Sequence, residues 1–470
     1  MKNRNLLNRL LICLTTVLVL VMGSSPVAAL TVEVREDTFS LHAKDAFLQD
    51  ILKRIARQGV TVRIDPQLNP KITASFTRKE MESGLKILLK SLDHALIWES
   101  MPDSERVRLA EIQIFEPGKR SRMRPLDTGG DLSITRNPKD GSFFVRDELL
   151  LRFGPGASLE EIEQLVHRIG GTIIARHEGT NVVRVRLPEN TDVPRLSEAL
   201  SKENGIARAE PNFAYPISLP YKGSTPVPVD FPEPPPLNPD EGAPIAVLDS
   251  GLMPGAGLED RILASLDAVN PGNMLTDGLG HGTQMSLVAS GLISPLGVDP
   301  VNASANPLIP IRAFDDNGMT SNFNLMRSID FAIQNGARVM SLSWGTETES
   351  RFLEDAMAYA EANHLLVVAS AGNEPTGKPV YPAAYSSVLG VGAEKPDGSF
   401  WEKSNFGDFV SLSAPGFAHM PVGYRGEPGA YAGTSIAAAF VANAAAGHIK
   451  NNPAVSKEDL RRFLENRFPK

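Results

Sequence analysis

The sequence predicts an α/β protein in which a large domain with buried strands follows two small α+β modules. Three observations lead to this prediction. The run at 245–248 is apolar without alternation, which is typical of a strand buried on both faces of a sheet. The alanine-rich stretch at 433–446 predicts a buried helix. Upstream, residues 31–101 and 148–216 each combine amphipathic helical stripes with short strands.

The first 29 residues have the features of a secretory signal. Basic residues within the first nine positions precede an apolar run, and small residues at 27–29 follow it in the pattern that precedes cleavage. A retained membrane anchor and a lipid-attached Cys13 are the alternatives, but the run is short for a span and the residues before Cys13 do not resemble a lipoprotein cleavage box. Because Cys13 is the only cysteine, cleavage would leave no disulfide and no cysteine metal ligand.

Length and charge limit the classes of partner. A chain of 470 residues with 42% hydrophobic residues allows two to four globular domains. Loss of three basic signal residues would take the formal charge from −8 to −11. Basic residues gather only at 119–124, so we expect no nucleic-acid partner.

Residues 30–115 predict the first small module. Helical stripes at 47–55 and 81–92 alternate with strands, among them the alternating run at 60–64. This pattern resembles the short N-terminal domain of secretins and TonB-dependent receptors of Gram-negative envelopes. The resemblance implies a module that binds an envelope protein. An additional piece of pro-region without a partner of its own is the alternative.

Residues 147–216 predict the second module. Ser158 and Glu161 have the spacing of a capping box before a helix with one apolar face, and residues 182–187 alternate as a strand. The module resembles the pro-domain of subtilisin-like proteases, and residues 209–212 are similar to the segment that ends many such pro-domains. The resemblance implies that residues 147–216 inhibit the domain that follows.

Two stretches without apolar periodicity are predicted as linkers. Residues 116–146 are rich in Pro, Gly and charged residues, and residues 217–240 belong to a stretch with nine prolines from Pro216 to Pro239. The second linker is a candidate for activation cleavage, although its length would equally suit a retained pro-domain.

Three residues of the last 230 carry candidate chemistry. Asp249 ends the buried strand, at the edge of an α/β sheet where sites form. His281 lies in a glycine-rich turn at a helix start, and Ser435 follows Gly433, which we expect to allow a tight turn, at the start of the alanine-rich helix. Each has a structural alternative, namely a turn, a structural histidine and a cap made by Thr434 or Ser435. Together they supply the parts of an acyl-transfer triad.

The order Asp, His, Ser is that of subtilisin, and the surrounding motifs resemble the subtilisin-like serine proteases of the peptidase S8 family. The matching motifs are Asp249-Ser250-Gly251, His281-Gly282-Thr283, Val367-Val368-Ala369-Ser370-Ala371-Gly372-Asn373 and Gly433-Thr434-Ser435-Ile436-Ala437. The resemblance covers about 241 to 450 and implies a doubly wound parallel sheet with flanking helices over 241–470.

The resemblance also assigns roles. Ser435 would attack the scissile carbonyl, His281 would accept and return the proton, and Asp249 would hold the imidazole. Asn373 and the backbone N–H of Ser435 would stabilise the oxyanion.

A substrate pocket is implied as well. One wall would be made by Ser341, Leu342, Ser343, Trp344 and Gly345, and the other by Ser370, Ala371 and Gly372. The alternative for Trp344 is packing in the core.

The chain departs from the family at positions that carry no catalytic group. These are Gln284 and Met285 after the histidine motif, and Ile436 and Ala439 in the serine helix. We expect no cofactor and no metal. The acidic loop at 315–318 could suggest calcium, but a plain turn explains it.

The sequence therefore predicts a secreted or periplasmic serine endopeptidase that is made as a pro-enzyme. A catalytically silent subtilisin fold kept for binding in the cell envelope is the alternative. A lipase or esterase is a third hypothesis, which the order of the triad and the lack of a Gly-x-Ser-x-Gly motif at Ser435 disfavour.

Overall fold

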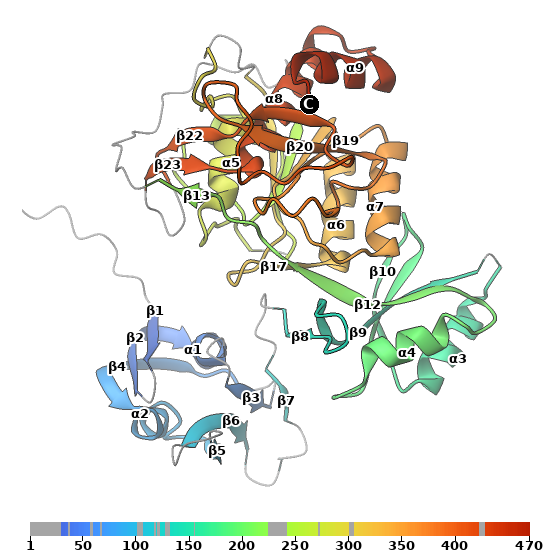
Figure 1. The fold of residues 1–470 in the computed structure, drawn as a ribbon. Coiled ribbons are helices and arrows are strands. Elements are labelled where there is room, and N and C mark those ends of the chain that lie inside the picture. The colour runs from blue at the N-terminus through green and yellow to red at the C-terminus, as the bar shows by residue number, and fades with distance from the viewer. Residues whose placement is uncertain are drawn as a thin grey trace, which may run out of the picture. The chain divides into compact units, whose positions relative to one another are not determined.

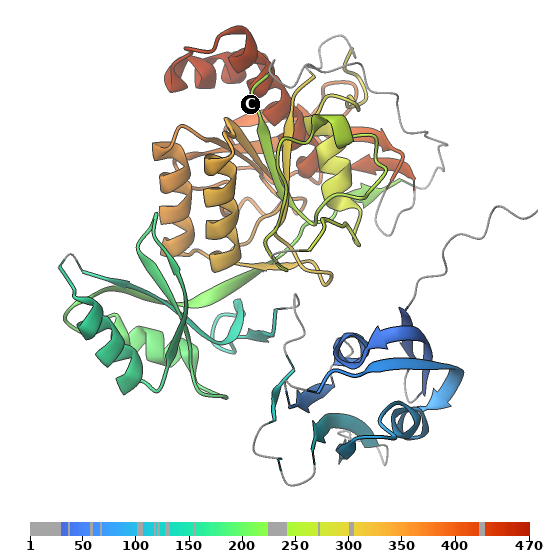
Figure 2. The ribbon, with the colours of Figure 1, turned by 180° about the vertical axis from the view of Figure 1, so that it is seen from behind.

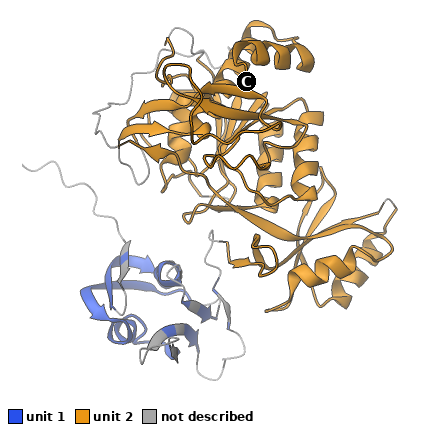
Figure 3. Ribbon diagram, in the orientation of Figure 1, with its two compact units in different colours: residues 1–129 blue, residues 130–470 orange. Residues whose placement is uncertain are grey.

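In the computed structural model the chain forms two compact units, residues 1–129 and residues 130–470 (Figure 3). The described residues are 30–35, 38–56, 60–65, 68–100, 107–116, 119, 123–126, 132–154, 156–223, 242–270, 273–299, 305–422 and 428–470. The predicted signal at 1–29 lies outside them. Within these ranges, no helix has both the length and the apolar character needed to cross a membrane.

Unit 1 is an α+β module with one core. Its sheets have the strand orders β1-β2-β4 and β5-β6-β3-β7. The elements are β1 (Leu30–Arg35), β2 (Thr38–Phe47), α1 (Leu48–Ala56), β3 (Thr61–Ile64), β4 (Lys71–Glu80), α2 (Met81–Leu88), β5 (Asp93–Ser100), β6 (Val107–Phe115) and β7 (Arg124–Pro125). The predicted stripes of α1 and α2 are buried in the core, whereas Phe47 ends β2 and is exposed.

Unit 2 begins with a small domain, residues 132–216, built on one sheet. Its elements are β8 (Ile134–Arg136), β9 (Phe143–Phe153), α3 (Leu159–Arg168), β10 (Thr172–His177), β11 (Val182–Arg186), α4 (Val193–Leu200) and β12 (Ile206–Pro216). The capping box is confirmed, because Ser158 Oγ accepts from the Glu161 N–H at 3.2 Å and the Ser158 N–H donates to Glu161 at 2.7 Å. The sheet has the order β10-β11-β9-β12-β17, and β17 (Met319–Ser321) comes from later in the chain.

The linker predicted at 116–146 is wrong in part. β7 lies within it and pairs with β3, and β8 and the first residues of β9 form a hairpin. The loop of this hairpin is a turn in which the Gly141 N–H donates to the Asn137 carbonyl. β8 has three residues and is held by its pairing with β9. A strand this short shows no apolar periodicity in the sequence.

The large domain, residues 242–470, contains the predicted parallel sheet. Seven strands lie in the order β15-β16-β14-β18-β19-β20-β21, and all neighbours in it are parallel. They are β14 (Ile245–Asp249), β15 (Leu266–Asp267), β16 (Leu308–Arg312), β18 (Val339–Leu342), β19 (Leu366–Ser370), β20 (Val388–Glu394) and β21 (Leu412–Pro415). The chain winds outward from β14 in both directions, so the predicted doubly wound topology is confirmed.

Helices cover both faces of this sheet (Figures 1 and 2). Ile245 and Val247 of β14 pack with α5 (His281–Ala289) and α8 (Thr434–Asn451), whereas Ala246 and Leu248 pack with α6 (Asn322–Gln334) and α7 (Arg351–Ala362). Burial on both faces explains why the run at 245–248 does not alternate. The remaining elements are η2 (Glu259–Arg261), β22 (Phe417–Met420), β23 (Gly429–Ala432) and α9 (Lys457–Arg467), and β13 (Tyr221–Lys222) pairs with β23.

The two departures in the serine helix belong to its packing. Ile436 and Ala439 are fully buried where α8 lies on the sheet. Gln284 of α5 is also buried, and its side chain donates to the Val422 carbonyl at 2.9 Å. These residues therefore help to fix the positions of α5 and α8.

Candidate active site

The site lies where the strand order reverses. β14 is followed in the sheet by β16 on one side and by β18 on the other, and Asp249 is its last residue. Crevices at such switch points, beyond the carboxyl ends of the strands, are where doubly wound sheets bind ligands. His281 is the first residue of α5 and Ser435 the second of α8, and the two helices pack against each other.

Asp249 and His281 form a buried pair. Oδ1 of Asp249 lies 2.7 Å from Nδ1 of His281, and both side chains are 1% exposed. The Ser250 N–H also donates to this oxygen at 2.7 Å, which holds the carboxylate in place. Nε2 of His281 has no hydrogen-bond partner among the described residues, so the imidazole is oriented with one nitrogen available.

The missing side chain of Gly282 allows this pair to meet. A Cβ on Gly282 would lie 2.3 Å from the Gly251 carbonyl oxygen, so the backbone after Asp249 touches the backbone after His281. A side chain at this position would push the end of the strand away from the start of the helix.

Asp277 fixes the loop before His281, a role that was not predicted from the sequence. Its carboxylate accepts from Ser250 Oγ at 2.8 Å, from the Gly280 N–H at 2.7 Å, and from the Thr283 N–H at 2.8 Å. Ser250 Oγ in turn accepts from the Gly282 N–H at 2.8 Å. The sequence signal that could have identified Asp277 is an acidic residue in a glycine-rich turn, four positions before the histidine.

Ser435 is fully buried at the start of α8. Its Oγ donates to the Ser343 carbonyl at 3.3 Å rather than to His281. The N-cap is Gly433, without a side-chain capping bond, so a cap made by Thr434 or Ser435 is wrong. Gly433 has an extended backbone with φ 177°, so the predicted tight turn is also wrong. Its missing side chain instead permits close approach, because a Cβ there would lie 3.2 Å from Cβ of Pro220.

Asn373 is held in one orientation by Thr434. The Thr434 N–H and hydroxyl both donate to Oδ1 of Asn373 at 2.9 Å, and the Gly372 N–H donates to the Thr434 hydroxyl at 3.2 Å. The NH₂ group of Asn373 therefore turns the other way, where it donates to the Leu219 carbonyl at 3.5 Å.

Thr434→Val should lower kcat about tenfold, because it removes a hydrogen bond worth about 1.4 kcal/mol and leaves the Asn373 amide held only by the Thr434 N–H. KM should change little, since Thr434 acts through Asn373. Thr434→Ser keeps the hydroxyl and should restore kcat. Steady-state kinetics of the two variants on one peptide substrate test this, and an equal loss in both would contradict the positioning role.

Six of the eight predicted pocket residues divide into two groups. Ser341, Leu342, Ser370 and Ala371 are buried in the strands and their ends. Gly345 and Gly372 lie against one side chain, Val380, because a Cβ on either would meet it within 4.0 Å. Ser343 Oγ donates to the Ser435 carbonyl at 3.4 Å.

Trp344 is part of the core. Its ring is fully buried and stacks on Tyr215 of β12, with ring centroids 5.3 Å apart and planes at 19°, and it meets the edge of Phe314 at 5.9 Å. The side chain of Trp344 therefore packs in the core, as the alternative has it, and leaves only the main chain of this residue for the predicted pocket wall.

The carboxylates of the acidic loop at 315–318 bind other groups of the protein. Asp315 accepts from the N–H groups of Asn317 and Met319, at 3.0 and 2.8 Å, and from the Leu132 N–H at 3.0 Å. Asp316 pairs with Arg312 at 2.7 Å. The described ranges hold no group of three His, Cys, Asp or Glu side chains arranged to bind a metal ion.

Comparisons with known proteins identify relatives of both domains of unit 2. Residues 133–212 match the model of the fervidolysin N-terminal prodomain. The solved structure of fervidolysin from Fervidobacterium pennivorans, described as a keratinolytic enzyme related to subtilisin, superimposes with a TM-score of 0.56 at 24% identity. The match covers 72% of this chain and 59% of that one, and it shows the fold.

Sequence relatives carry the family assignment. Subtilisin Savinase of Lederbergia lenta is 33% identical over 226 residues, which are 48% of this chain and 82% of that protein. The minor extracellular protease Epr of Bacillus subtilis (strain 168) is 36% identical over 173 residues, 37% of this chain, and the match spans only about a quarter (26%) of its length. Residues 240–469 match the model described as the subtilase family. The chain therefore belongs to the subtilase family, peptidase S8.

Proposed function

We propose that the chain is a serine endopeptidase made as a precursor, in which its own residues 214–223 block the site. The observation that carries this proposal is the path of these residues. They leave the small domain, pass Asn373 and Gly433, and continue along β23, so that they cross the site as an extended peptide substrate would.

On the acyl side the segment adds a strand to the large domain. Ala214, Tyr215 and Pro216 pair antiparallel with β17, and the Ile217 N–H donates to the Gly318 carbonyl at 2.8 Å. Main-chain pairing of this kind holds peptides of many sequences, which suits an endopeptidase.

The peptide bond between Leu219 and Pro220 lies at the candidate oxyanion site. The Leu219 carbonyl accepts from Asn373 at 3.5 Å, and Pro220 lies against Gly433, two residues before Ser435. Beyond the bond, β13 pairs with β23, and the Gly223 N–H donates to the Ala430 carbonyl at 2.8 Å.

The proposed reaction follows from these positions. When Ser435 Oγ leaves the Ser343 carbonyl and turns to Nε2 of His281, the imidazole takes its proton as the oxygen attacks the substrate carbonyl. Asp249 stabilises the imidazolium, and the amide of Asn373 together with the Ser435 N–H stabilises the oxyanion. His281 then protonates the leaving nitrogen, and water hydrolyses the acyl-enzyme.

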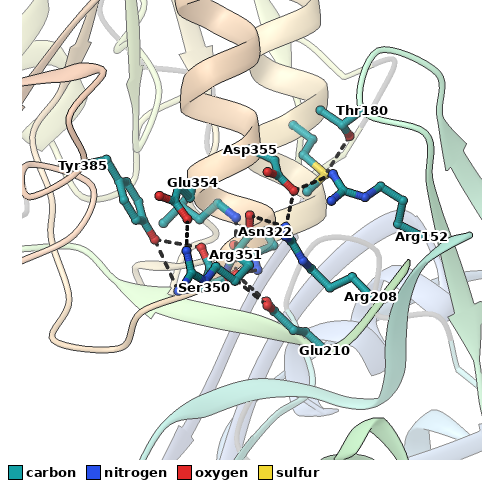
Figure 4. Close-up of polar contacts among 12 residues, drawn as sticks. Arg152, Thr180, Arg208, Glu210, Asn322, Ser350, Arg351, Glu354, Asp355 and Tyr385 are labelled. Atoms are coloured by element: carbon teal, nitrogen blue, oxygen red, sulfur yellow. Dashed lines mark hydrogen bonds and ion pairs between the residues drawn. The ribbon is translucent and has the colours of Figure 1, made fainter. Parts of the chain in front are cut away.

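Docking of the small domain supports its role as an inhibitor (Figure 4). Glu210 accepts from Ser350 Oγ at 2.7 Å and from the Arg351 N–H at 3.1 Å, which places a carboxylate at the N-terminus of α7. Unpaired N–H groups and the helix dipole favour an anion there. Further along α7, Asp355 accepts from Arg152 at 2.6 Å.

The start of α6 is closed in the same way. Asn212 accepts from the Phe323 N–H at 3.2 Å, and the Tyr215 hydroxyl donates to Asn322 at 2.7 Å. Two helix ends of the large domain thus depend on the small domain for hydrogen bonds, which favours a docked precursor.

Glu210 makes the stability of this docked form depend on pH. Burial raises the pKa of Glu210 above its ordinary value of 4.5, against the hydrogen bonds from Ser350 and Arg351. A carboxyl group with a raised pKa binds its proton more tightly when folded, so its contribution is complete below pH 4.5 and is lost as the pH rises through the raised pKa. Because glutamine does not titrate, Glu210→Gln should not lose this stability as the pH rises. The Tm of the two proteins, measured from about pH 4 to pH 8 in a Ser435→Ala background, tests it, with Glu354→Gln as the control. Parallel Tm curves for wild-type Glu210 and Glu210→Gln would contradict it.

Export and an envelope partner complete the proposal. The predicted signal and the extracellular relative support a secreted or periplasmic enzyme. The α+β fold of unit 1 is compatible with a module that binds an envelope protein.

Hydrolysis assays test the proposed function directly. The purified protein should cleave internally quenched peptides and a peptide p-nitroanilide, and a serine-directed fluorophosphonate should add one mass label at Ser435. Activity confined to simple esters would favour the esterase hypothesis. Absence of both turnover and labelling, after the small domain has been removed by limited proteolysis, would favour the binding protein.

A further inference from the structure

Tyr221 lies in a site of its own on the leaving-group side of the cleft. Nζ of Lys403 lies 3.8 Å from the centroid of the Tyr221 ring, above its face. Trp401 meets the same ring edge to face, with centroids 5.7 Å apart and planes at 81°. Both contacts belong to the geometries in which aromatic rings bind cations and other rings.

The two contacting residues are built differently. Trp401 is 4% exposed and its ring is fixed against Phe417, 5.6 Å away at 78°, so it forms a rigid wall. Lys403 is exposed, and within the described part of the chain it makes no ion pair. Its ammonium group is therefore available to an aromatic ring that packs against Trp401.

The backbone register relates this site to the scissile bond. Tyr221 pairs with Ala432, and β23 leads through Gly433 directly to Ser435. Because the Leu219 carbonyl lies at Asn373, Tyr221 is the second residue beyond the bond. A substrate in the same register would place its own second leaving-side residue between Trp401 and Lys403.

We propose that Trp401 and Lys403 form a binding site for an aromatic side chain two residues beyond the scissile bond. This inference rests on the proposed function. A ring gains both the face contact with the ammonium group and the edge contact with the indole, whereas an aliphatic side chain gains neither. A lysine or arginine would be repelled by Lys403. Tyr221 is 43% exposed, so the site is open on one side and takes phenylalanine and tyrosine alike.

Paired peptides test the preference. Both peptides begin with Pro-Ile-Ser-Leu, copied from residues 216–219, and continue with Ser-Tyr-Lys-Gly or Ser-Ala-Lys-Gly. We expect kcat/KM to be about tenfold higher for the tyrosine peptide, with phenylalanine close to tyrosine. Because each preparation is measured on both peptides, the fraction of molecules still blocked by their own segment cancels in the ratio.

Variants assign the preference to the two residues. Lys403→Met keeps the length of the side chain but removes the charge, and it should lower the tyrosine-to-alanine ratio about threefold. Lys403→Arg should retain the ratio. Lys395→Met, the same change at a lysine that pairs with Glu402 instead, is the matched control and should leave the ratio unchanged. Equal rates for tyrosine and alanine, a preference for glutamate, or a ratio that Lys403→Met leaves intact would each overturn the proposal.

A binding measurement separates this inference from the proposed function. In the full-length Ser435→Ala chain, Tyr221 itself occupies the site, and the Gly223 N–H reports its hold through the bond to Ala430. Lys403→Met should speed hydrogen exchange at residues 221–223 about threefold, and Lys395→Met should not. If Lys403→Met speeds exchange but the wild type hydrolyses no peptide, only the proposed endopeptidase function is refuted. Turnover without either the peptide preference or the exchange effect would refute the aromatic site alone.

Discussion

Ser435→Ala is expected to lower kcat for peptide hydrolysis by about a millionfold, the loss known for the corresponding serine in subtilisin, a relative in the same family. Ser435 is the hydroxyl that the family motif assigns as nucleophile, and its Oγ is bonded to the Ser343 carbonyl, while Nε2 of His281 is without a partner among the described residues. The residue is fully buried and alanine fills less space, so the fold should persist. Kinetics on a quenched peptide, with circular dichroism of the same preparations, measure the effect.

A second serine provides the control. Ser328 is also fully buried, but its hydroxyl donates within α6 to the Asn324 carbonyl at 2.8 Å. Ser328→Ala removes the same atom and should keep most of the activity. If Ser435→Ala retained more than about a hundredth of the activity, the nucleophile would be another group and the proposed mechanism would be wrong.

The large domain could be predicted because its signals are local. The buried run at 245–248 identifies β14 without any knowledge of its neighbours. Asp249, His281, Asn373 and Ser435 lie in motifs whose residues adjoin one another in the chain, and the fold brings Asp249 to His281 as the triad requires. The capping box at Ser158 was predictable for the same reason, since both partners lie within one helical turn.

What could not be predicted depends on contacts between distant segments. Trp344 has the sequence context of a pocket wall, but Tyr215 of the small domain stacks on it and keeps its ring in the core. Gly433 suggests a turn by composition, whereas its extended backbone serves the close approach of Pro220. The strand β13 lies in a proline-rich stretch without periodicity and exists because β23 pairs with it. No pattern within a single stretch reports such partners.

Pro220→Ala is expected to speed self-cleavage after Leu219 about a hundredfold, the scale of the effect that a displacement of roughly 1 Å has on a catalytic group. The bond between Leu219 and Pro220 lies at Asn373, but its nitrogen belongs to a proline ring. The ring carbon occupies the position of an amide hydrogen and crowds the nitrogen that His281 must protonate. The wild-type segment should therefore bind as a substrate and resist cleavage as an inhibitor. Intact mass and N-terminal sequencing of the secreted proteins measure the rate, and Pro220→Ala should yield a new N-terminus at position 220.

Two further chains decide whether the proline itself is responsible. Pro216→Ala removes a proline from the same segment, where Pro216 pairs with Met319 ahead of the bond, and it should leave the bond intact. The double variant with Ser435→Ala should remain full length after signal removal, because the cleavage is the work of the same serine. Cleavage at another bond in Pro220→Ala would mean that the segment binds in a different register during turnover. Unchanged resistance at residue 219 would mean that the hydrogen bond from Ser435 to the Ser343 carbonyl, and not the proline, silences the precursor.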